Sequence, residues 1–221
     1  MYHTIVIGGG CLGASTAISL QHKLNKQNKK EKVCLIDKSV LCAAESSRHS
    51  GIVRCANADQ DASIMASEST KLWKNLESIW GVGMESEQFG AIWISKKNQD
   101  GENKAWKELS KRMESINITF KEIDHSIASD LCGKSLVINK DESYYFEPAA
   151  LQIDPSILRS TIYDALDYNG VDVFEKTAVD TILSDENKIT TCITNNGKFS
   201  AKNFVNAVGA WSPQLFLKIG I

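Results

Sequence analysis

The sequence of 221 residues predicts an α/β fold, and three observations carry this prediction. Apolar runs rich in β-branched residues occur at 4–7 and 33–36 without a polar interruption, as in parallel strands that are buried on both faces. A glycine-rich turn and a segment with helical spacing of its apolar residues lie between them. Later segments of alternating polarity, joined by short polar turns, indicate an antiparallel meander.

The turn after the first strand has the spacing G-x-G-x-x-G, formed by Gly8, Gly10 and Gly13. In this pattern the first glycine permits a tight reversal, the second lets a pyrophosphate approach backbone N–H groups, and the third lets helix and strand pack closely. The following helix, predicted over 11–24, would direct its unpaired N–H groups and positive dipole end at the phosphates. The alternative is a doubly wound domain whose glycines serve packing only.

The second strand ends on Asp37, where a carboxylate can accept hydrogen bonds from a ribose 2′-hydroxyl and would repel a 2′-phosphate. The sequence therefore predicts a Rossmann-like dinucleotide-binding unit, made of a strand, a glycine turn, a helix and a second strand that ends on an acid. The helix is expected to turn four apolar residues toward the sheet, namely Leu12, Ala17, Ile18 and Leu20.

Composition limits the class of protein. The chain is 43% hydrophobic and 24% charged, and its 25 Lys+Arg against 27 Asp+Glu provide no basic footprint for nucleic acid or anionic membrane. Six cysteines without a C-x-x-C pair indicate reduced packing residues, and no metal site is expected. The sequence has no run of about 18 apolar residues and no basic leader. It therefore predicts no membrane-spanning helix and no signal peptide, and the expected location is cytoplasmic.

The middle of the chain interrupts the nucleotide-binding pattern. Strands are predicted at 90–95, 118–123 and 143–146, and a helix at 102–116. Tyr144 and Tyr145 line a substrate cavity or fill the core, and their place in a strand favours the core. An amphipathic helix is predicted over 61–80, with an inner face made of Ile64, Met65, Leu72, Trp73, Leu76 and Ile79.

The last third returns to the first pattern. Asp154 is predicted as the N-cap and Pro155 as the first residue of a helix that ends at Asn169-Gly170. Strands are then expected at 171–179, 179–184 and 189–194, with a hairpin turn at Asn196-Gly197. A final strand from residue 202 runs into a turn at Gly209.

Three motifs make the resemblance to a family specific. ESSRHSGIVR follows the acid-terminated strand at 45–54, QIDPS stands at 152–156, and VNAVGAWS at 205–212. In this order they resemble FAD-dependent amine or amino-acid oxidoreductases of the D-amino-acid oxidase superfamily, in the branch of glycine oxidase, sarcosine oxidase and dimethylglycine dehydrogenase. Such relatives continue well past the third motif, so the resemblance covers their N-terminal part.

The resemblance implies a Rossmann-like FAD-binding domain with a β-meander, made of residues 1–74 and 153–221, and a partial α+β substrate domain inserted at 75–152. It also implies contacts with FAD along the glycine turn, the acid, the serine-rich loop, the adenine-side strand and the last motif. The implied cofactor-binding residues are Gly8, Gly10, Cys11, Leu12, Gly13, Asp37, Lys38, Ser46, Ser47, Arg48, His49, Ser50, Gly51, Ala178, Val179, Ala207, Gly209 and Trp211.

Two residues are candidates for catalysis. His49 either tethers the flavin covalently, as in some relatives, or only hydrogen-bonds near it, or faces solvent. Arg54, like Arg48, suits bidentate binding of a substrate carboxylate, but a phosphate contact or a surface ion pair fits equally. The sequence leaves these alternatives open.

Three interpretations of function follow. The favoured one is an FAD-dependent oxidoreductase that oxidises the C–N bond of a small amino acid or secondary amine by hydride transfer to flavin. The second is a truncated or split fragment that binds FAD or ADP without activity alone, its flavin pocket being completed by a partner chain. The third is an NAD-binding module, because Asp37 suits NAD as well as FAD.

Overall fold

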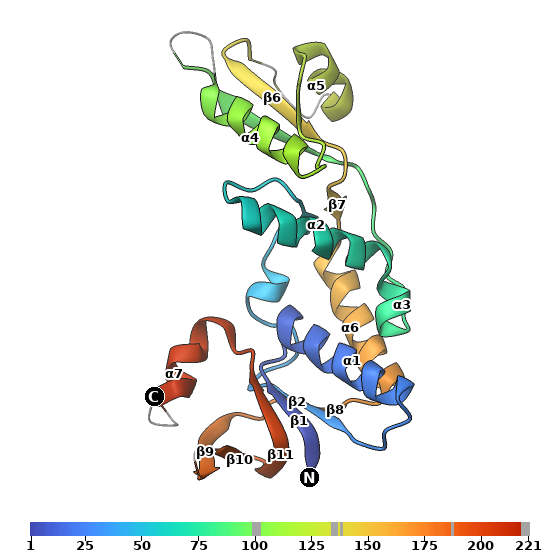
Figure 1. Ribbon diagram of the computed structural model, residues 1–221, viewed down its shortest axis with the longest axis vertical. Coiled ribbons are helices and arrows are strands. Elements are labelled where there is room, and N and C mark those ends of the chain that lie inside the picture. Colours follow the sequence, from blue (N-terminus) through green and yellow to red (C-terminus); the bar gives the residue numbers. More distant parts are fainter. Residues whose placement is uncertain (99–102, 134–136, 138, 187, 218–221) are drawn as a thin grey trace. The chain divides into compact units, whose positions relative to one another are not determined.

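The structure, a computed structural model, describes residues 1–98, 103–133, 137, 139–186 and 188–217. The chain forms two compact units (Figure 1). The first unit comprises Met1–Ser50, Asn75–Met84 and Pro155–Ile221, and the second comprises Gly51–Lys74 and Glu85–Asp154. This division differs from the sequence-based one in three segments, because 51–74 and 153–154 belong to the second unit and 75–84 to the first.

A six-stranded sheet of order β8-β2-β1-β11-β10-β9 organises the first unit. Four neighbouring strands are parallel, and the last two join antiparallel through hairpins. This arrangement confirms the predicted α/β fold with a β-meander. The strands are β1 (Tyr2–Ile7), β2 (Val33–Ile36), β8 (Asp172–Phe174), β9 (Val179–Asp185), β10 (Lys188–Thr194) and β11 (Gly197–Asn206).

Both faces of the central strands are buried, as their apolar runs predict. Ile5 and Ile36 point toward the meander, where they form one core cluster with Ile182 and Cys192. Because side chains alternate along a strand, Leu35 points to the opposite face. Helices α1 (Cys11–Lys26) and α6 (Pro155–Asn169) pack together, and α1 also contacts β1 and β2.

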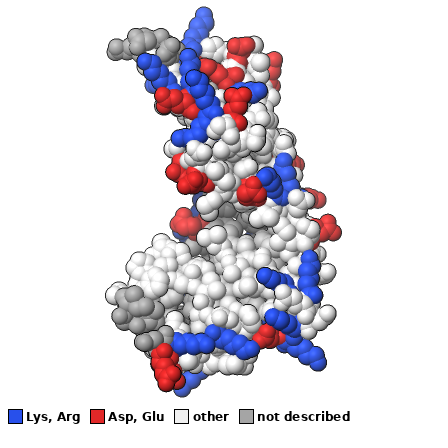
Figure 2. Space-filling view, in the orientation of Figure 1, with Lys and Arg blue, Asp and Glu red and all other residues white. Residues whose placement is uncertain are grey.

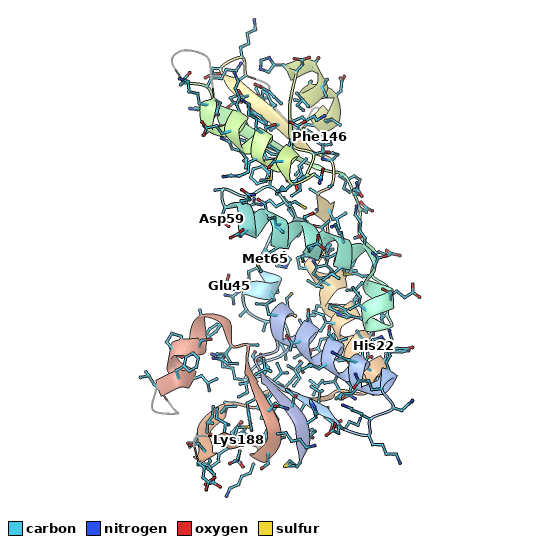
Figure 3. All side chains as sticks on the ribbon, in the orientation of Figure 1. His22, Glu45, Asp59, Met65, Phe146 and Lys188 are labelled. Carbon is cyan, nitrogen blue, oxygen red and sulfur yellow. The ribbon has the colours of Figure 1, made fainter. Side chains whose placement is uncertain are left out.

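The helices of the first unit are joined by hydrogen bonds around one buried amide. The Asn169 side chain donates to the Trp80 carbonyl at 2.6 Å. His22, which lies on α1 and is labelled in Figure 3, has its Nδ1 2.8 Å from Asn169 Oδ1. Trp80 ends α3 (Leu76–Trp80). The unit also contains the short helices η1 (Glu45–Ser47), η3 (Gly209–Trp211) and α7 (Ser212–Leu217).

The second unit is built on an antiparallel sheet of order β4-β6-β5. Aromatic rings form its core, with Phe120 stacked on Tyr145 at 5.3 Å and Trp106 beside both. Tyr144 and Tyr145 are fully buried, in agreement with the core assignment. The elements are β3 (Ile52–Val53), α2 (Gln60–Lys74), β4 (Ala91–Lys96), α4 (Lys104–Ser115), β5 (Lys121–Ile123), α5 (His125–Cys132), β6 (Glu142–Glu147) and β7 (Leu151–Gln152).

The single helix predicted over 61–80 is wrong, because the chain breaks at Asn75 into α2 and α3. The predicted inner face of α2 is also wrong: Met65, labelled in Figure 3, is 74% exposed, and Leu72 is 56% exposed. Ser63 and Thr70 are buried instead, since their hydroxyls donate to the helix carbonyls of Asp59 and Ala66.

Two smaller predictions also need correction. Leu12, expected to face the sheet, is 82% exposed, because it lies in the first turn of α1 beside a cavity. The strand expected over 171–179 ends at Phe174, and the chain turns through Lys176, whose φ is 51°, before β9 begins. Helix α5 was not predicted, and the start of the helix expected at 102–116 lies outside the described residues.

Charge is distributed without a dominant sign. On the face drawn in Figure 2, positive and negative side chains of the described residues are intermixed. Within the described part of the chain, no helix combines the length and the apolar character needed to cross a membrane.

Candidate functional site

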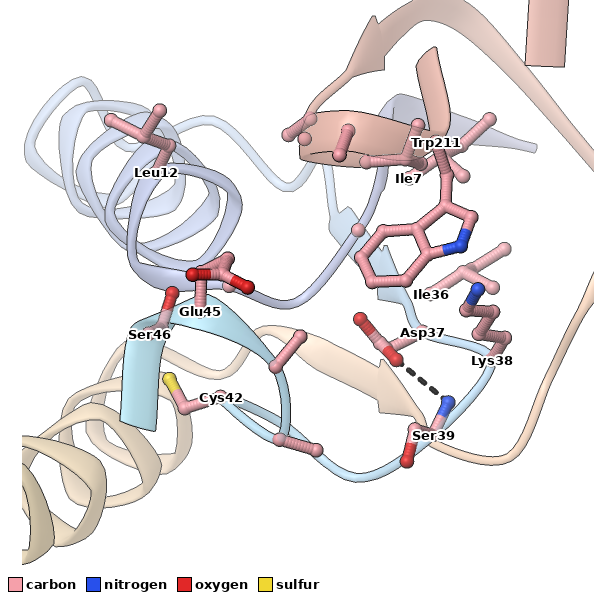
Figure 4. A pocket seen from close by; sticks show the side chains of 18 of the residues that line it. Ile7, Leu12, Ile36, Asp37, Lys38, Ser39, Cys42, Glu45, Ser46 and Trp211 are labelled. Atoms are coloured by element: carbon pink, nitrogen blue, oxygen red, sulfur yellow. Dashed lines mark hydrogen bonds between the residues drawn. The ribbon is translucent and has the colours of Figure 1, made fainter. Parts of the chain in front are cut away.

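A cavity of about 390 Å³ opens in the first unit at the carboxyl ends of the parallel strands. Its walls come from the turn after β1, the end of β2, the loop that contains η1, and the segment after β11. Figure 4 shows Asp37, Lys38 and Trp211 on one side of this cavity and Cys42 and Ser46 on the other. In doubly wound sheets, ligands bind at the carboxyl ends of the strands. The binding crevice lies where the connections from two adjacent strands run to opposite faces of the sheet.

The glycine turn is shaped by close backbone contacts. Gly8 has a φ of 107°, and a side chain there would place its Cβ 2.4 Å from the Ala207 carbonyl oxygen. At Gly13 the Cβ would lie 1.8 Å from the Gly8 carbonyl oxygen. Both positions therefore require glycine, since the first helix and the ends of β1 and β11 meet there without room for a methyl group.

Gly10 differs from these two because it borders the cavity. A Cβ there would meet one atom, the Oγ of Ser46 at 3.0 Å. Gly10 is also the N-cap of α1 and offers no side chain to the first helical N–H groups. Ser46 accepts the Cys11 N–H at 2.9 Å, and the positive end of the α1 dipole faces the cavity.

Asp37 is fixed by two backbone donors. Its Oδ2 accepts the Gly9 N–H at 2.6 Å, and its Oδ1 accepts the Ser39 N–H at 2.7 Å, a bond drawn in Figure 4. A carboxylate has about four acceptor positions, so two remain for a ligand. Above it, Lys38 Nζ lies 3.9 Å from the centroid of the Trp211 ring, a cation–π contact that holds the indole at the cavity edge.

The wall after β2 is anchored from the other side of the fold. Glu175 accepts the Leu41 N–H at 2.7 Å and the hydroxyl of Tyr163 on α6 through the same oxygen. Burial and the bond to Glu175 raise the pKa of Tyr163, so its hydroxyl remains a donor. The Cys42 N–H, next in the chain, donates to the Gly9 carbonyl at 2.9 Å, which ties this wall to the glycine turn.

Replacement of Glu175 by alanine is expected to loosen this wall. The Leu41 N–H loses a charged acceptor, which contributes about 1.5–3 kcal/mol, and exchange of the backbone amides at 40–44 should accelerate at least tenfold. Hydrogen exchange followed by mass spectrometry measures this. Glu175→Gln keeps an oxygen acceptor for both donors and serves as the matched control, and equal exchange in the two variants would contradict the anchoring role.

Most of the residues predicted from the sequence meet at this cavity. Those that line it are Gly8, Gly10, Cys11, Leu12, Asp37, Lys38, Ser46, Ala178, Val179, Ala207, Gly209 and Trp211. Those that do not line it are Gly13, Ser47, Arg48, His49, Ser50 and Gly51. Ala178 lines the cavity, and its backbone is fixed because its N–H and carbonyl both bond to Asn195.

Sequence reasoning missed several lining residues, among them Ser39, Cys42, Glu45 and Gln214. The resemblance predicts cofactor contacts for the serine-rich loop from Ser46 onward, but no pattern singles out the residues that precede it. Cys42 has a φ of 57°, a conformation that side chains other than glycine or asparagine rarely adopt and that sequence gives no means to foresee.

The two catalytic candidates are held elsewhere. His49 is exposed, and its Nε2 lies 3.1 Å from the Ser46 carbonyl oxygen. Arg54 belongs to the second unit, where its guanidinium donates to the Ala56 carbonyl at 2.6 Å and lies 4.4 Å from the centroid of the Trp93 ring. The described residues contain no group of three or more His, Cys, Asp or Glu arranged to hold a metal ion.

Comparison with known proteins identifies the fold. Residues 3–220 match a family described as FAD dependent oxidoreductase. L-proline dehydrogenase from P. horikoshii superposes with a TM-score of 0.84 at 23% identity, and glycine oxidase from Geobacillus kaustophilus with a TM-score of 0.84 at 19% identity. Each match covers 100% of this chain, and they cover 56% and 58% of the two solved chains.

A curated relative is similar along almost the whole chain. It is the mitochondrial pyruvate dehydrogenase phosphatase regulatory subunit of Mus musculus, which is 24% identical over 213 residues, or 96% of this chain and 23% of the relative. The chain thus spans little more than half of the two matched structures and about a quarter of this curated relative.

Proposed function

The chain belongs to the family of FAD dependent oxidoreductases, and on this basis we propose that its first unit binds the adenosine diphosphate part of FAD in the cavity beside the glycine turn. The observation that carries the proposal is Gly10, whose missing side chain leaves open space in front of the α1 N-terminus. A diphosphate there would receive backbone N–H groups and the positive end of the helix dipole.

The rest of the cavity suits the remaining parts of the nucleotide. The free acceptor positions of Asp37 would bind the ribose hydroxyls, and the apolar surface formed by Ala178 and Val179 would meet the adenine. Trp211 would cover the cofactor, with its ring held by Lys38. Ser46, which already holds the Cys11 N–H, would keep the serine-rich loop against the diphosphate.

The proposed reaction is oxidation of the C–N bond of a small amino acid or secondary amine, for which FAD would supply the hydride acceptor. The matched L-proline dehydrogenase and glycine oxidase support this substrate class by their names. Within this chain, Arg54 is proposed to bind the substrate carboxylate, since a guanidinium can bind a carboxylate through two parallel N–H groups. His49 remains the second candidate.

A second candidate function is nucleotide binding without catalysis. The curated relative is a regulatory subunit by name, and the chain spans about half of the matched oxidase and dehydrogenase structures. A nucleotide-binding chain that acts within an assembly, or that is completed by a partner chain, agrees with both facts. NAD is a further ligand of the same chemistry, because Asp37 suits either ribose.

Calorimetric titration of the 221-residue chain with FAD, ADP and NAD tests the proposal. We expect FAD and ADP to bind, with ADP contributing most of the affinity. Gly10→Val should abolish binding of both nucleotides while the circular dichroism spectrum stays unchanged, because the Cβ added at Gly10 borders the cavity and has only the Ser46 Oγ of the fold within 4 Å.

Gly83→Val is the matched control, since Gly83 belongs to the same unit and a Cβ there lies 3.8 Å from the nearest atom, a Glu77 oxygen. It should bind ADP like the parent chain. Undiminished binding by Gly10→Val would refute the assignment. Tight binding of NAD without binding of FAD would favour an NAD-binding module over a flavoenzyme. Reduction of bound flavin by an amine would favour C–N bond oxidation over nucleotide binding without catalysis.

A further inference from the structure

In the described part of the chain, strand β4 of the second unit has one edge without a neighbouring strand. It pairs antiparallel with β6 in an unbroken register, from Ala91 opposite Glu147 to Lys96 opposite Glu142. The strand order β4-β6-β5 leaves its other side at the edge of the sheet. An edge of this kind presents a row of backbone N–H and C=O groups that can pair with a further strand.

The hydrogen bonds around β4 show which residues point to this edge. In an antiparallel pair, alternate residues exchange backbone hydrogen bonds with the partner strand, and the residues between them point outward. The Lys97 N–H donates to the Asp141 carbonyl at 2.9 Å, so Lys97 belongs to the inward set. The Lys96 carbonyl points outward, since it accepts the Asn103 side chain at 3.2 Å. The outward set of β4 is therefore Ile92, Ile94 and Lys96.

Ile92 and Ile94 are open at this edge in both backbone and side chain. Among the described residues, their outward N–H and C=O groups have no hydrogen-bond partner. Because side chains alternate along a strand, both isoleucine side chains lie on the face of the sheet opposite Trp93. Ile94 is 43% exposed. The edge thus combines free backbone groups with apolar side chains, which is the combination that favours pairing with another strand.

The other sheet edges of the described residues carry features that prevent such pairing. Strands β3, β5, β7 and β8 have two or three residues each. Strand β9 is longer but carries carboxylates at Asp180 and Asp185. Short strands and charged side chains are the usual protection of a sheet edge. Strand β4 has six residues, and its charged residue, Lys96, stands at its end, so most of its edge lacks this protection.

We propose that β4 pairs antiparallel with β4 of a second copy of this chain, so that the two sheets become continuous. In the register centred on Trp93, Ile92 lies opposite Ile94 of the second copy, and Ile94 lies opposite Ile92. All of these residues point outward, so their free N–H groups find carbonyl acceptors across the new contact. The isoleucine side chains then meet as apolar cross-strand pairs.

The symmetry and the charge of β4 suit a second copy as the occupant of this edge. A two-fold axis at Trp93 exchanges Ile92 and Ile94, so the same surface serves both partners. Antiparallel pairing also places Lys96 of the two copies at opposite ends of the contact, about 20 Å apart along the strands. This separation exceeds the screening length of about 8 Å at physiological salt, so the lysines do not oppose pairing. Because one short strand buries little surface, we expect a weak dimer.

Sedimentation equilibrium of the 221-residue chain in reducing buffer tests the dimer. We expect a monomer–dimer equilibrium with a dissociation constant in the micromolar range. Ile94→Pro should weaken dimerisation at least tenfold, because it removes an outward N–H group and leaves the bonds to β6 intact. Ile94→Lys should act in the same direction, since a lysine at an edge discourages pairing, and it keeps the backbone unchanged.

Ile127→Lys is the matched control. Ile127 lies on α5 of the same unit and is 45% exposed, which is close to the exposure of Ile94. This variant should dimerise like the parent chain. Hydrogen exchange followed by NMR adds a readout for each residue: the amides of Ile92 and Ile94 should gain protection as the protein concentration rises. The Glu122 amide, which points outward from β5, should exchange equally fast at every concentration.

Four results would overturn the proposal. The first is a parent chain that stays monomeric, and the second is a dimer that Ile94→Lys and Ile94→Pro leave unchanged. The third is a dimer that Ile127→Lys weakens as much as Ile94→Lys. The fourth is concentration-independent protection of the Ile92 and Ile94 amides, which would place a different segment on this edge. A concentration-dependent gain of protection at both amides, lost in the Ile94 variants, would support pairing through β4.

Discussion

Gly13→Ala is expected to destabilise the first unit by about 3 kcal/mol or more and to weaken ADP binding at least a hundredfold. The added methyl carbon would lie 1.8 Å from the Gly8 carbonyl oxygen and 3.1 Å from the Ala207 Cβ, both on rigid backbone segments. Helix α1 must therefore move away from the ends of β1 and β11, and the cavity deforms with it. Thermal unfolding and ADP titration measure the two effects.

Gly10→Ala is the matched control, because it adds the same methyl group three residues earlier. Its Cβ meets only the Ser46 hydroxyl, at 3.0 Å, which can rotate away. This variant should unfold within about 1 kcal/mol of the parent chain. Equal stability of the Gly13 and Gly10 variants would contradict the close packing of α1 on the glycine turn.

Glu147→Ala is expected to cost about 3 kcal/mol or more in the second unit, because it leaves buried donors without an acceptor. Glu147 is fully buried, and its carboxylate accepts the N–H groups of Cys55 and Ala56 and the indole N–H of Trp93. Hydrogen exchange of peptides that cover 54–57 should lose protection, since these backbone amides then open to water.

Glu108→Ala provides the comparison, as Glu108 is an exposed carboxylate on α4 of the same unit. Surface substitutions of this kind change stability by about 0.5 kcal/mol or less. If the Glu147 variant matched this small effect, the carboxylate would not be what holds the loop after β3. Because that loop begins with Arg54, the Glu147 variant also tests whether the position of the Arg54 guanidinium depends on the Glu147 carboxylate.

The glycine turn and the parallel core were predictable because local chemistry dictates them. Gly8 and Gly13 have no room for a side chain, and β1 and β2 are buried on both faces, so their sequences carry the pattern directly. The meander was predictable for the same reason, since the Asn196-Gly197 pair is typical of a tight hairpin turn. Gly197 has a φ of 121° in this turn.

What the sequence did not foretell depends on contacts between distant segments. The polar face of α2 is buried because Ser63 and Thr70 satisfy their hydroxyls within the helix, which reverses the expected inner face. Glu175 holds the Leu41 N–H across 134 positions of the chain, and the Cys42 N–H joins its loop to the glycine turn through the Gly9 carbonyl. No periodicity in the sequence indicates such pairings, because neither residue of a pair stands out from its neighbours in the sequence.

The pairing of β1 with β11 determines when the parallel part of the sheet can be completed during synthesis of the chain. Tyr2 aligns with Ala201 and Ile7 with Asn206, so β1 can pair with β11 only after the chain has been translated through residue 206. This contact order predicts slow folding, with an apolar strand edge open in the nascent chain until residue 206 has emerged. Chaperone capture of such intermediates is therefore expected to fall sharply once β11 is translated.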